Sequence, residues 1–217
     1  MNALKGVVGL ILCRKGSVGV PKKNTRLLKG IPLYVHQVNN LKKAGVEKVY
    51  VSTNDKTIID QAKKYGFIAV RRPEHLCKNT SKCEEALRHF TEKFNYNILV
   101  FAQATSPMCD HKYIKQGLEE ILKPDCDSVV SVCLEHWLPR WSLSMNPIDW
   151  DTEKRPRRQD VKEVYVENGS FYITTKKEFL KSYIRYSGRI KPVVMPHYDS
   201  FQVDTEEDFE IISRLIK

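Results

Sequence analysis

The chain has 217 residues, of which 41% are hydrophobic and 29% charged, and its formal net charge is +10. This composition is ordinary for a globular protein with a buried core and argues against a disordered chain. The positive charge favours an anionic ligand such as a nucleotide, a nucleic acid or an acidic sugar. No apolar run is long enough to cross a bilayer, so we expect a soluble, cytoplasmic protein without a membrane partner. Six cysteines without a Cys-x-x-Cys pair predict reduced thiols rather than structural zinc.

Strand and helix patterns alternate along most of the chain. Short runs rich in branched residues predict buried strands at 7–13, 49–53, 67–70, 98–101, 128–133 and 170–173. Amphipathic patterns predict a helix over residues 56–65 and further helices that begin at Pro32, near Thr80, near Tyr113 and at a capping box formed by residues 205–208. This alternation is typical of an α/β fold with a mainly parallel sheet, and the length predicts a single domain over residues 1–217.

The alternation breaks between residues 134 and 166. This segment contains all three tryptophans and a basic cluster at residues 154–158. It is too apolar for a disordered linker. We therefore expect an excursion from the main sheet that serves dimerisation and reaches the ligand site.

The first predicted strand ends in a basic loop at residues 14–24. The loop contains four cations and two glycines, namely Arg14, Lys15, Lys22 and Lys23 with Gly16 and Gly19. Glycine lets a backbone approach a ligand closely, and ligands of open parallel sheets bind beyond the carboxyl ends of the strands. The spacing matches neither the Walker loop nor the dinucleotide-binding Gly-x-Gly-x-x-Gly. The loop is therefore a candidate polyphosphate site, with a solvated basic turn as the alternative.

Other predicted strands also end in polar residues. Asp55, Arg72, Gln103 and the turn at Asn168 each follow such a strand or adjoin it. Any one of them alone would be an ordinary turn or capping residue. Their repetition along the chain predicts a nucleotide site at the carboxyl edge of the sheet.

Several motifs resemble those of the acylneuraminate cytidylyltransferases, the CMP-sialic acid synthetases. They are the loop Arg14-x-Gly-Ser-x-Gly-x-Pro-x-Lys-Asn24, Arg71-Arg-Pro73 with Thr80-Ser81, Gln103-Ala-Thr-Ser-Pro107, Lys154–Asp160, Glu167–Tyr172 and Asp199–Asp204. The resemblance implies a Rossmann-like three-layer nucleotidyltransferase fold. It also implies transfer of CMP from CTP to the anomeric hydroxyl of a sialic-acid-type keto-sugar acid, with release of pyrophosphate. Mg²⁺ is the implied cofactor, and a homodimer or a dimer of dimers is the implied assembly.

The resemblance assigns roles residue by residue. The implied nucleotide contacts are Arg14, Gly16, Ser17, Lys23, Asn24, Arg72 and Ser81, and the implied sugar contacts are Gln103, Arg157, Arg158, Gln159 and Asn168. Lys23 and Arg155 are the implied catalytic residues, and Asp204 is the implied metal ligand. Two positions depart from the family pattern: Val18 replaces a lysine, and Gln202 replaces a second aspartate, which makes position 202 a weaker metal ligand.

The expected reaction needs positive charge from the protein more than a protein nucleophile, because the sugar hydroxyl is itself the attacking group. Attack of a hydroxyl on the α-phosphorus moves negative charge onto the departing pyrophosphate, which cations and backbone amides can stabilise. A planar guanidinium suits the carboxylate of the sugar. The six histidines are dispersed, so no general base is assigned.

Three alternatives stay open at this point. The run Lys154–Arg158 is also typical of a nuclear localisation signal or a nucleic-acid-binding patch. We expect no nucleic-acid partner, because the chain lacks an aromatic stacking signature and a helix-turn-helix pattern. A Kdo-like acceptor, including an 8-amino one, would need nearly the same site. Val18 and Gln202 also allow a degenerate homologue without activity.

Overall fold

The computed structural model describes residues 5–17 and 19–216, and Val18 lies outside the described residues. The main sheet has seven strands in the order β11-β7-β10-β6-β1-β4-β5. They are β1 (Val7–Leu12), β4 (Lys48–Thr53), β5 (Ile68–Arg71), β6 (Ile98–Ala102), β7 (Ser128–Leu134), β10 (Tyr165–Thr175) and β11 (Ile190–Met195). Only β10 among them is antiparallel to its neighbours in the described sheet, so the prediction of a mainly parallel sheet is confirmed.

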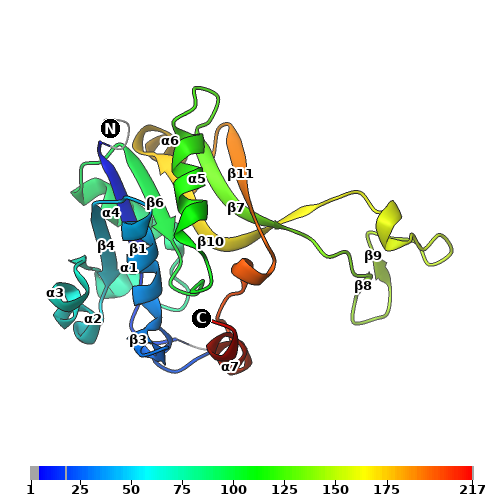
Figure 1. Cartoon of the computed structure of the whole chain (residues 1–217), viewed down its shortest axis with the longest axis horizontal. Coiled ribbons are helices and arrows are strands. Elements are labelled where there is room, and N and C mark those ends of the chain that lie inside the picture. The colour runs from blue at the N-terminus through cyan, green and yellow to red at the C-terminus, as the bar shows by residue number, and fades with distance from the viewer. Residues whose placement is uncertain (1–4, 18, 217) are drawn as a thin grey trace.

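Helices cover both faces of this sheet and make a three-layer α/β fold (Figure 1). They are α1 (Leu33–Lys43), α2 (Lys56–Asp60), α3 (Ala62–Tyr65), α4 (Cys83–Lys93), α5 (His111–Ile121), α6 (Lys176–Ser182) and α7 (Glu206–Leu215). Helices α1 and α5 pack on one face, whereas α4 and α6 pack on the other. No helix within the described ranges has the length and apolar character needed to cross a membrane.

Strand β1 lies in the interior of the sheet, between β6 and β4. Val7 and Ile11 pack in the core that contains α1, while Val8 and Leu10 pack in the core that contains α4. Burial on both faces explains why the strand is a continuous apolar run rather than an alternating one. The buried strand fixes the position of the basic loop that follows it.

The structure differs from the sequence prediction in several elements, among them the short strands β2 (Leu27–Leu28) and β3 (Ile31–Pro32), which were not predicted. The helix expected over 56–65 is divided at Gln61 into α2 and α3. Strand β10 is longer than the expected 170–173 and contains a register shift between Glu167 and Tyr172. Helix α6 and strand β11 were not predicted. Pro192 interrupts the strand pattern of β11, and the structure tolerates it because β11 lies at the edge of the sheet.

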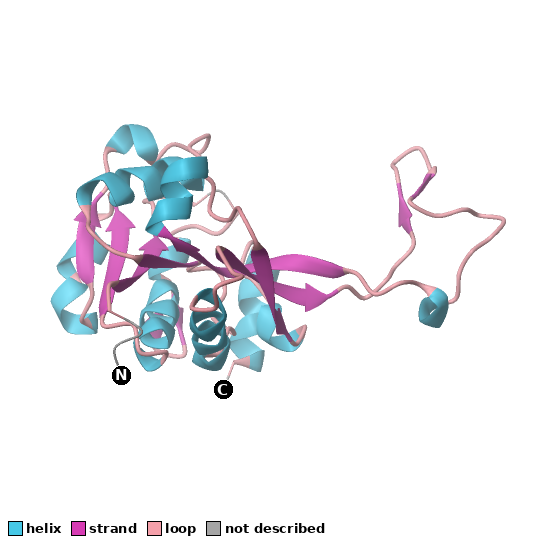
Figure 2. Ribbon diagram, turned by 90° about the horizontal axis from the view of Figure 1, so that it is seen from above, coloured by secondary structure: helices cyan, strands magenta, loops and turns pink. Residues whose placement is uncertain are grey.

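The expected excursion is a long arm, residues 135–164, which leaves the body after β7 and returns into β10 (Figures 1 and 2). Its regular structure is the small hairpin β8 (Arg140–Trp141) and β9 (Pro147–Ile148) and a short 3₁₀ helix at Arg158–Asp160. Leu138 and Met145 are exposed on the arm, and Leu143 is fully exposed. The described arm thus presents apolar side chains that the body of the same chain does not cover.

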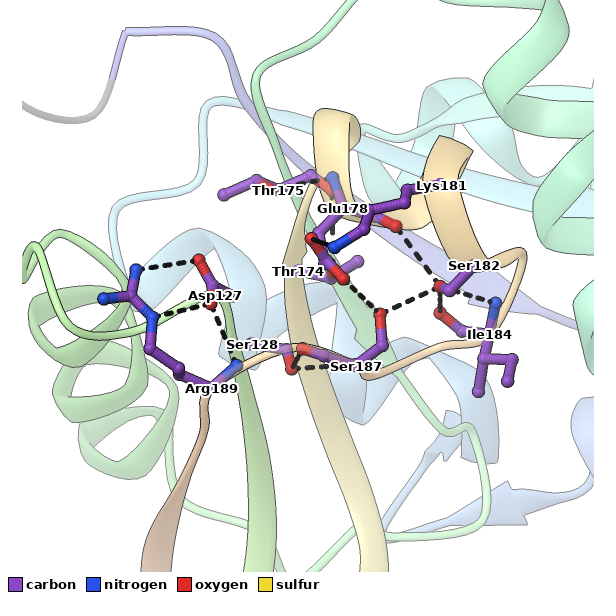
Figure 3. Close-up of polar contacts among 10 residues, drawn as sticks. All are labelled: Asp127, Ser128, Thr174, Thr175, Glu178, Lys181, Ser182, Ile184, Ser187 and Arg189. Atoms are coloured by element: carbon purple, nitrogen blue, oxygen red, sulfur yellow. Dashed lines mark hydrogen bonds and ion pairs between the residues drawn. The ribbon is translucent and has the colours of Figure 1, made fainter.

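A polar cluster lies where strand β7 begins, beside α6 and the loop before β11 (Figure 3). Asp127 accepts hydrogen bonds from the backbone amide and the guanidinium of Arg189 at 2.9 and 2.8 Å. Ser128 donates to the carbonyl of Ser187 at 2.6 Å, and Ser187 donates to Glu178 at 2.9 Å. These bonds attach the loop before β11 to the start of β7 and to α6.

Candidate active site

A cavity of about 160 Å³ opens at the carboxyl ends of β1 and β6. The loop contributes Arg14, Gly16, Ser17, Lys23 and Asn24, and the wall is completed by Leu12, Cys83, Phe101, Gln103, Ala104 and Thr105. A smaller hollow shares most of the loop residues of this cavity and adds Lys22, Thr25 and Asp55. Of the strand-end residues predicted to meet at one end of the sheet, the loop, Asp55 and Gln103 line these two hollows, and the turn at Asn168 adjoins Gln103.

The loop is held in shape by its own contacts. Val20 is fully buried with Leu28 and Phe209 in a small core between the loop and α7. The side-chain amide of Asn24 donates to the carbonyl of Arg14 at 3.2 Å and closes the loop. The backbone amide of Lys15 donates to Asn54 Oδ1 at 2.7 Å. Asn24 thus has a structural role in addition to its place in the cavity wall.

The two cations in the cavity wall have fixed partners. Arg14 Nη1 donates to Asn79 Oδ1 at 2.6 Å, which fixes the position of its guanidinium. Lys23 Nζ donates to the carbonyl of Val203 at 2.9 Å and to Asp204 Oδ1 at 3.1 Å. Because both side chains line the cavity, their positive charge faces any ligand that enters it.

The segment 200–204 connects the loop to the rest of the site. The amide of Val203 donates to the carbonyl of Thr105 at 2.8 Å, at the end of β6. Gly19 lies so close that a Cβ there would overlap the backbone oxygen of Asp204. The amide of Asp204 donates to Asp208 Oδ2 at 2.9 Å, in the predicted capping box of α7. This segment is therefore fixed against both the loop and the sheet.

The turn at Asn168 is part of the same junction. The side-chain amide of Asn168 donates to Ser200 Oγ at 2.9 Å, and Gln202 Nε2 donates to the carbonyl of Asn168. Gly169 has φ +65°, and a Cβ there would overlap Gln202 Nε2 and lie 3.1 Å from Gln103 Nε2. Asn168 is buried and joins two segments of the chain. The structure thus gives this predicted sugar contact a structural role.

Arg72 and Ser81 lie outside the set of residues that line the cavity. Arg72 is only 5% exposed, and its Nη2 donates to the carbonyl of Ser52 at 3.2 Å. Its Nε is buried without a partner among the described residues. Ser81 donates to the carbonyl of His75 at 3.1 Å, which fixes the turn before α4.

The predicted residues of the basic cluster lie on the arm, away from this cavity. Arg155 places its guanidinium 5.9 Å from the ring centroid of Trp150. Arg157 forms an ion pair with Asp160 at 2.7 Å. Arg158 and Gln159 line a hollow at the base of the arm. Within one chain, the structure therefore separates the predicted site into a loop group and an arm group.

Sequence reasoning missed several residues beside the cavity. Cys83 lines it at the first turn of α4, and burial raises the pKa of its thiol. Arg185 Nε donates to Glu84 Oε1 at 2.7 Å, and its guanidinium lies 5.1 Å from the ring centroid of Tyr172. Cys83 and Glu84 lie at the start of a predicted helix that follows the nucleotide motifs, which could have indicated that they lie near the site. Arg185 lies in a loop without any sequence motif, so nothing in the sequence indicates its position.

The expected metal ligand is placed where a cation could be held. The carboxylate of Asp204 is 65% exposed next to Lys23. Gln202 uses its Nε2 on Asn168, so its Oε1 is the atom left for a ligand. No cluster of three or more His, Cys, Asp or Glu within residues 5–17 and 19–216 could hold a metal ion. One carboxylate fits Mg²⁺ when phosphate and water supply the other ligands.

Two comparisons concern the fold. A CMP:2-keto-3-deoxy-manno-octonic acid synthetase complexed with CTP superposes with a TM-score of 0.74 at 16% identity, over 97% of this chain and 98% of that chain. A 4-diphosphocytidyl-2C-methyl-D-erythritol synthase from Anaerococcus prevotii gives a TM-score of 0.66 at 12% identity, over 96% of each chain. The Rossmann-like, nucleotidyltransferase type of α/β fold is therefore confirmed.

The sequence comparisons identify the family. The chain is 32% identical over 215 residues to N-acylneuraminate cytidylyltransferase B of Danio rerio, covering 95% of this chain and 50% of that protein. It is 31% identical to CMP-N,N'-diacetyllegionaminic acid synthase of Legionella pneumophila, covering 97% and 96%. The chain thus spans about half the length of the first of these relatives. Residues 8–215 match the profile of the Cytidylyltransferase family, and the chain belongs to that family.

Proposed function

We propose that this protein transfers CMP from CTP to the anomeric hydroxyl of a sialic-acid-type keto-sugar acid and releases pyrophosphate. The observation that carries the proposal is the cationic loop, which places Arg14 and Lys23 in the wall of a cavity at the end of β1. The cytidylyltransferase match over residues 8–215 supports the choice of nucleotide. The names of the relatives, an N-acylneuraminate cytidylyltransferase and a legionaminic acid synthase, support the class of acceptor.

The loop would act by positioning and by charge. Its backbone amides, together with Gly16 and Ser17, bind the triphosphate, while Arg14 and Lys23 face its oxygens. Negative charge grows on the pyrophosphate as the bond between the α-phosphorus and the bridging oxygen breaks, and fixed cations stabilise that charge. Asp204 would hold Mg²⁺, which when bound supplies further neutralisation of the phosphates.

The acceptor would enter beside Gln103. Gln103 lines the cavity, and its side chain adjoins Gly169 in the turn that carries Asn168. A guanidinium is then needed for the carboxylate of the sugar. The candidates Arg155, Arg157 and Arg158 lie on the arm, away from the cavity of their own chain. A second copy of the chain could supply them.

We therefore include a homodimer in the proposal, in which the arm of each protomer reaches the cavity of its partner. The exposed apolar side chains Leu138, Leu143 and Met145 on the arm support this assembly, because a second copy would cover them. The arm also carries the basic run 154–158, so nuclear import and sugar binding could use the same residues.

A panel of acidic keto-sugars, offered as acceptors, tests the proposal. Pyrophosphate release from CTP and Mg²⁺ is measured with N-acetylneuraminic acid, its deaminated analogue, a legionaminic acid, Kdo and 8-amino Kdo, with ATP, GTP and UTP as controls. Release that needs CTP and one of these acids supports the proposal. No pyrophosphate release with any acid, from folded protein that does not bind CTP, would favour the degenerate or nucleic-acid-binding alternative.

The arm is tested by substitution and by mixing. Arg155→Ala should abolish turnover without changing the melting temperature, whereas Arg140→Ala on the same arm, paired with Asp149 at 2.9 Å, should retain turnover. An inactive Lys23→Ala protomer mixed with an inactive Arg155→Ala protomer should recover activity, because one cavity of the mixed dimer has both groups intact. Mixtures that exchange subunits but stay inactive would contradict the shared site.

A further inference from the structure

The expected phosphate-binding lysine and the expected metal-binding carboxylate are already paired with each other. Lys23 Nζ lies 3.1 Å from Asp204 Oδ1 and 2.9 Å from the carbonyl of Val203. The lysine side chain is 14% exposed and lines the cavity, whereas the carboxylate is 65% exposed at its rim. In this arrangement each charge partly neutralises the other, so a ligand that takes one of them deprives the other of its partner.

The backbone around this pair is fixed, whereas the carboxylate of Asp204 is largely exposed and has room to turn. Val203 is buried and bonded to Thr105, and the amide of Asp204 is bonded to Asp208. Gly19 packs against the backbone oxygen of Asp204. A rotation of the Asp204 side chain can therefore break the ion pair without moving the loop or the segment 200–204.

We infer that Asp204 makes the site select the divalent-cation complex of the nucleotide over the free nucleotide, through an exchange of ion-pair partners with Lys23. The inference rests on the proposed function. A cation–triphosphate complex satisfies both groups, because the phosphate takes the ammonium of Lys23 and the cation takes the carboxylate of Asp204. A free triphosphate draws away Lys23 and leaves an unpaired carboxylate beside its own negative charge.

This inference predicts a result that a simple metal ligand would not give. If Asp204 only held the cation, then its loss would remove the effect of Mg²⁺ and leave the binding of free CTP unchanged. If Asp204 discriminates, then its loss also strengthens the binding of free CTP. The affinity of the metal-free nucleotide is therefore the deciding quantity.

The experiment measures CTP binding by calorimetry in EDTA and in excess Mg²⁺. The wild-type protein should bind CTP much more tightly with Mg²⁺ than without it. Asp204→Asn should bind metal-free CTP about fivefold more tightly than wild type, the size expected for release of an exposed ion pair, and should gain little from Mg²⁺. Asp204→Ser serves as a second variant without the amide group.

Glu206 provides the matched control. It is another exposed carboxylate near the loop, but it pairs with Arg26 rather than with Lys23. Glu206→Gln changes the net charge by the same amount and should leave metal-free CTP binding within about twofold of wild type. Metal-free binding that is unchanged or weaker in both Asp204 variants would overturn the inference, while Mg²⁺-dependent CTP binding by wild type would still support the proposed function. Absence of CTP binding by wild type under either condition would overturn both.

Discussion

Gly169 offers a sharp test of the junction between β10 and the segment 200–204. Its φ of +65° disfavours any residue with a Cβ, and such a Cβ would overlap Gln202 Nε2. The backbone term is about 1–2 kcal/mol, and loss of the bond from Gln202 to the carbonyl of Asn168 adds about 1 kcal/mol. Gly169→Ala should therefore lower the free energy of unfolding by about 2–3 kcal/mol.

Gly30 provides a control that isolates the contact. It has φ +80°, but a Cβ there would meet nothing within 4 Å. Gly30→Ala should therefore lose only the backbone term of about 1–2 kcal/mol. For a chain of this size we expect melting temperatures lower by about 8 °C for Gly169→Ala and by about 4 °C for Gly30→Ala.

The assay combines calorimetric melting with substrate kinetics. Displacement of Gln202 and Gln103 around the altered turn should raise the KM for the acceptor sugar in Gly169→Ala, while CTP affinity changes little because the loop contacts remain. Equal losses of stability in the two variants, with an unchanged KM for the sugar, would refute the reasoning that the turn positions these glutamines.

Three further results are expected. The Arg189 guanidinium holds the pKa of Asp127 well below its usual range, so this pair stabilises the fold above the unfolded pKa of about 4, and that stabilisation is lost as the pH falls through the lower folded pKa. Asp127→Asn should therefore flatten the acid side of a curve of unfolding free energy against pH, and a curve identical to that of wild type would contradict this. Cys83 lines the cavity, whereas the other five cysteines are buried. CTP should therefore protect Cys83 from alkylation by iodoacetamide, measured by mass spectrometry, and equal labelling of Cys83 with and without CTP would place the nucleotide elsewhere. Gln202→Asp should lower the melting temperature, because a carboxylate cannot donate a hydrogen bond to the carbonyl of Asn168. The same change should lower the Mg²⁺ concentration that gives the half-maximal rate, and an unchanged Mg²⁺ concentration would mean that position 202 does not face the metal.

The sequence predicts the elements whose cause is local. The buried run of β1 and the capping box of α7 each have a pattern confined to a few residues, and both are confirmed. Strand β11 was missed because Pro192 breaks the strand pattern, and only its position at the sheet edge makes that residue acceptable. The division of the predicted helix into α2 and α3 at Gln61 was missed as well, because no glycine or proline at that position indicates it.

The site was predictable as a set of residues but not as an arrangement. Motif order gave the loop, Gln103 and Asp204, all of which lie at one end of the sheet. The ion pair between Lys23 and Asp204 joins positions far apart in the chain, and no spacing rule encodes such a contact. The same holds for the bond from Asn168 to Ser200, which gives that residue a structural role. The separation of Arg155 from the cavity of its own chain also depends on the path of the whole excursion, which no local pattern encodes.

In the proposed reaction, the α-phosphorus of CTP is transferred to a sugar hydroxyl. The most direct measurement follows CTP labelled with ³²P at the α-position in the presence of Mg²⁺ and the active acid from the panel. The label should move into a sugar-linked phosphodiester while the released pyrophosphate stays unlabelled, and Lys23→Ala should abolish the transfer. Label that stays in CTP, or that appears in free CMP at the same rate with and without the sugar, would contradict the account.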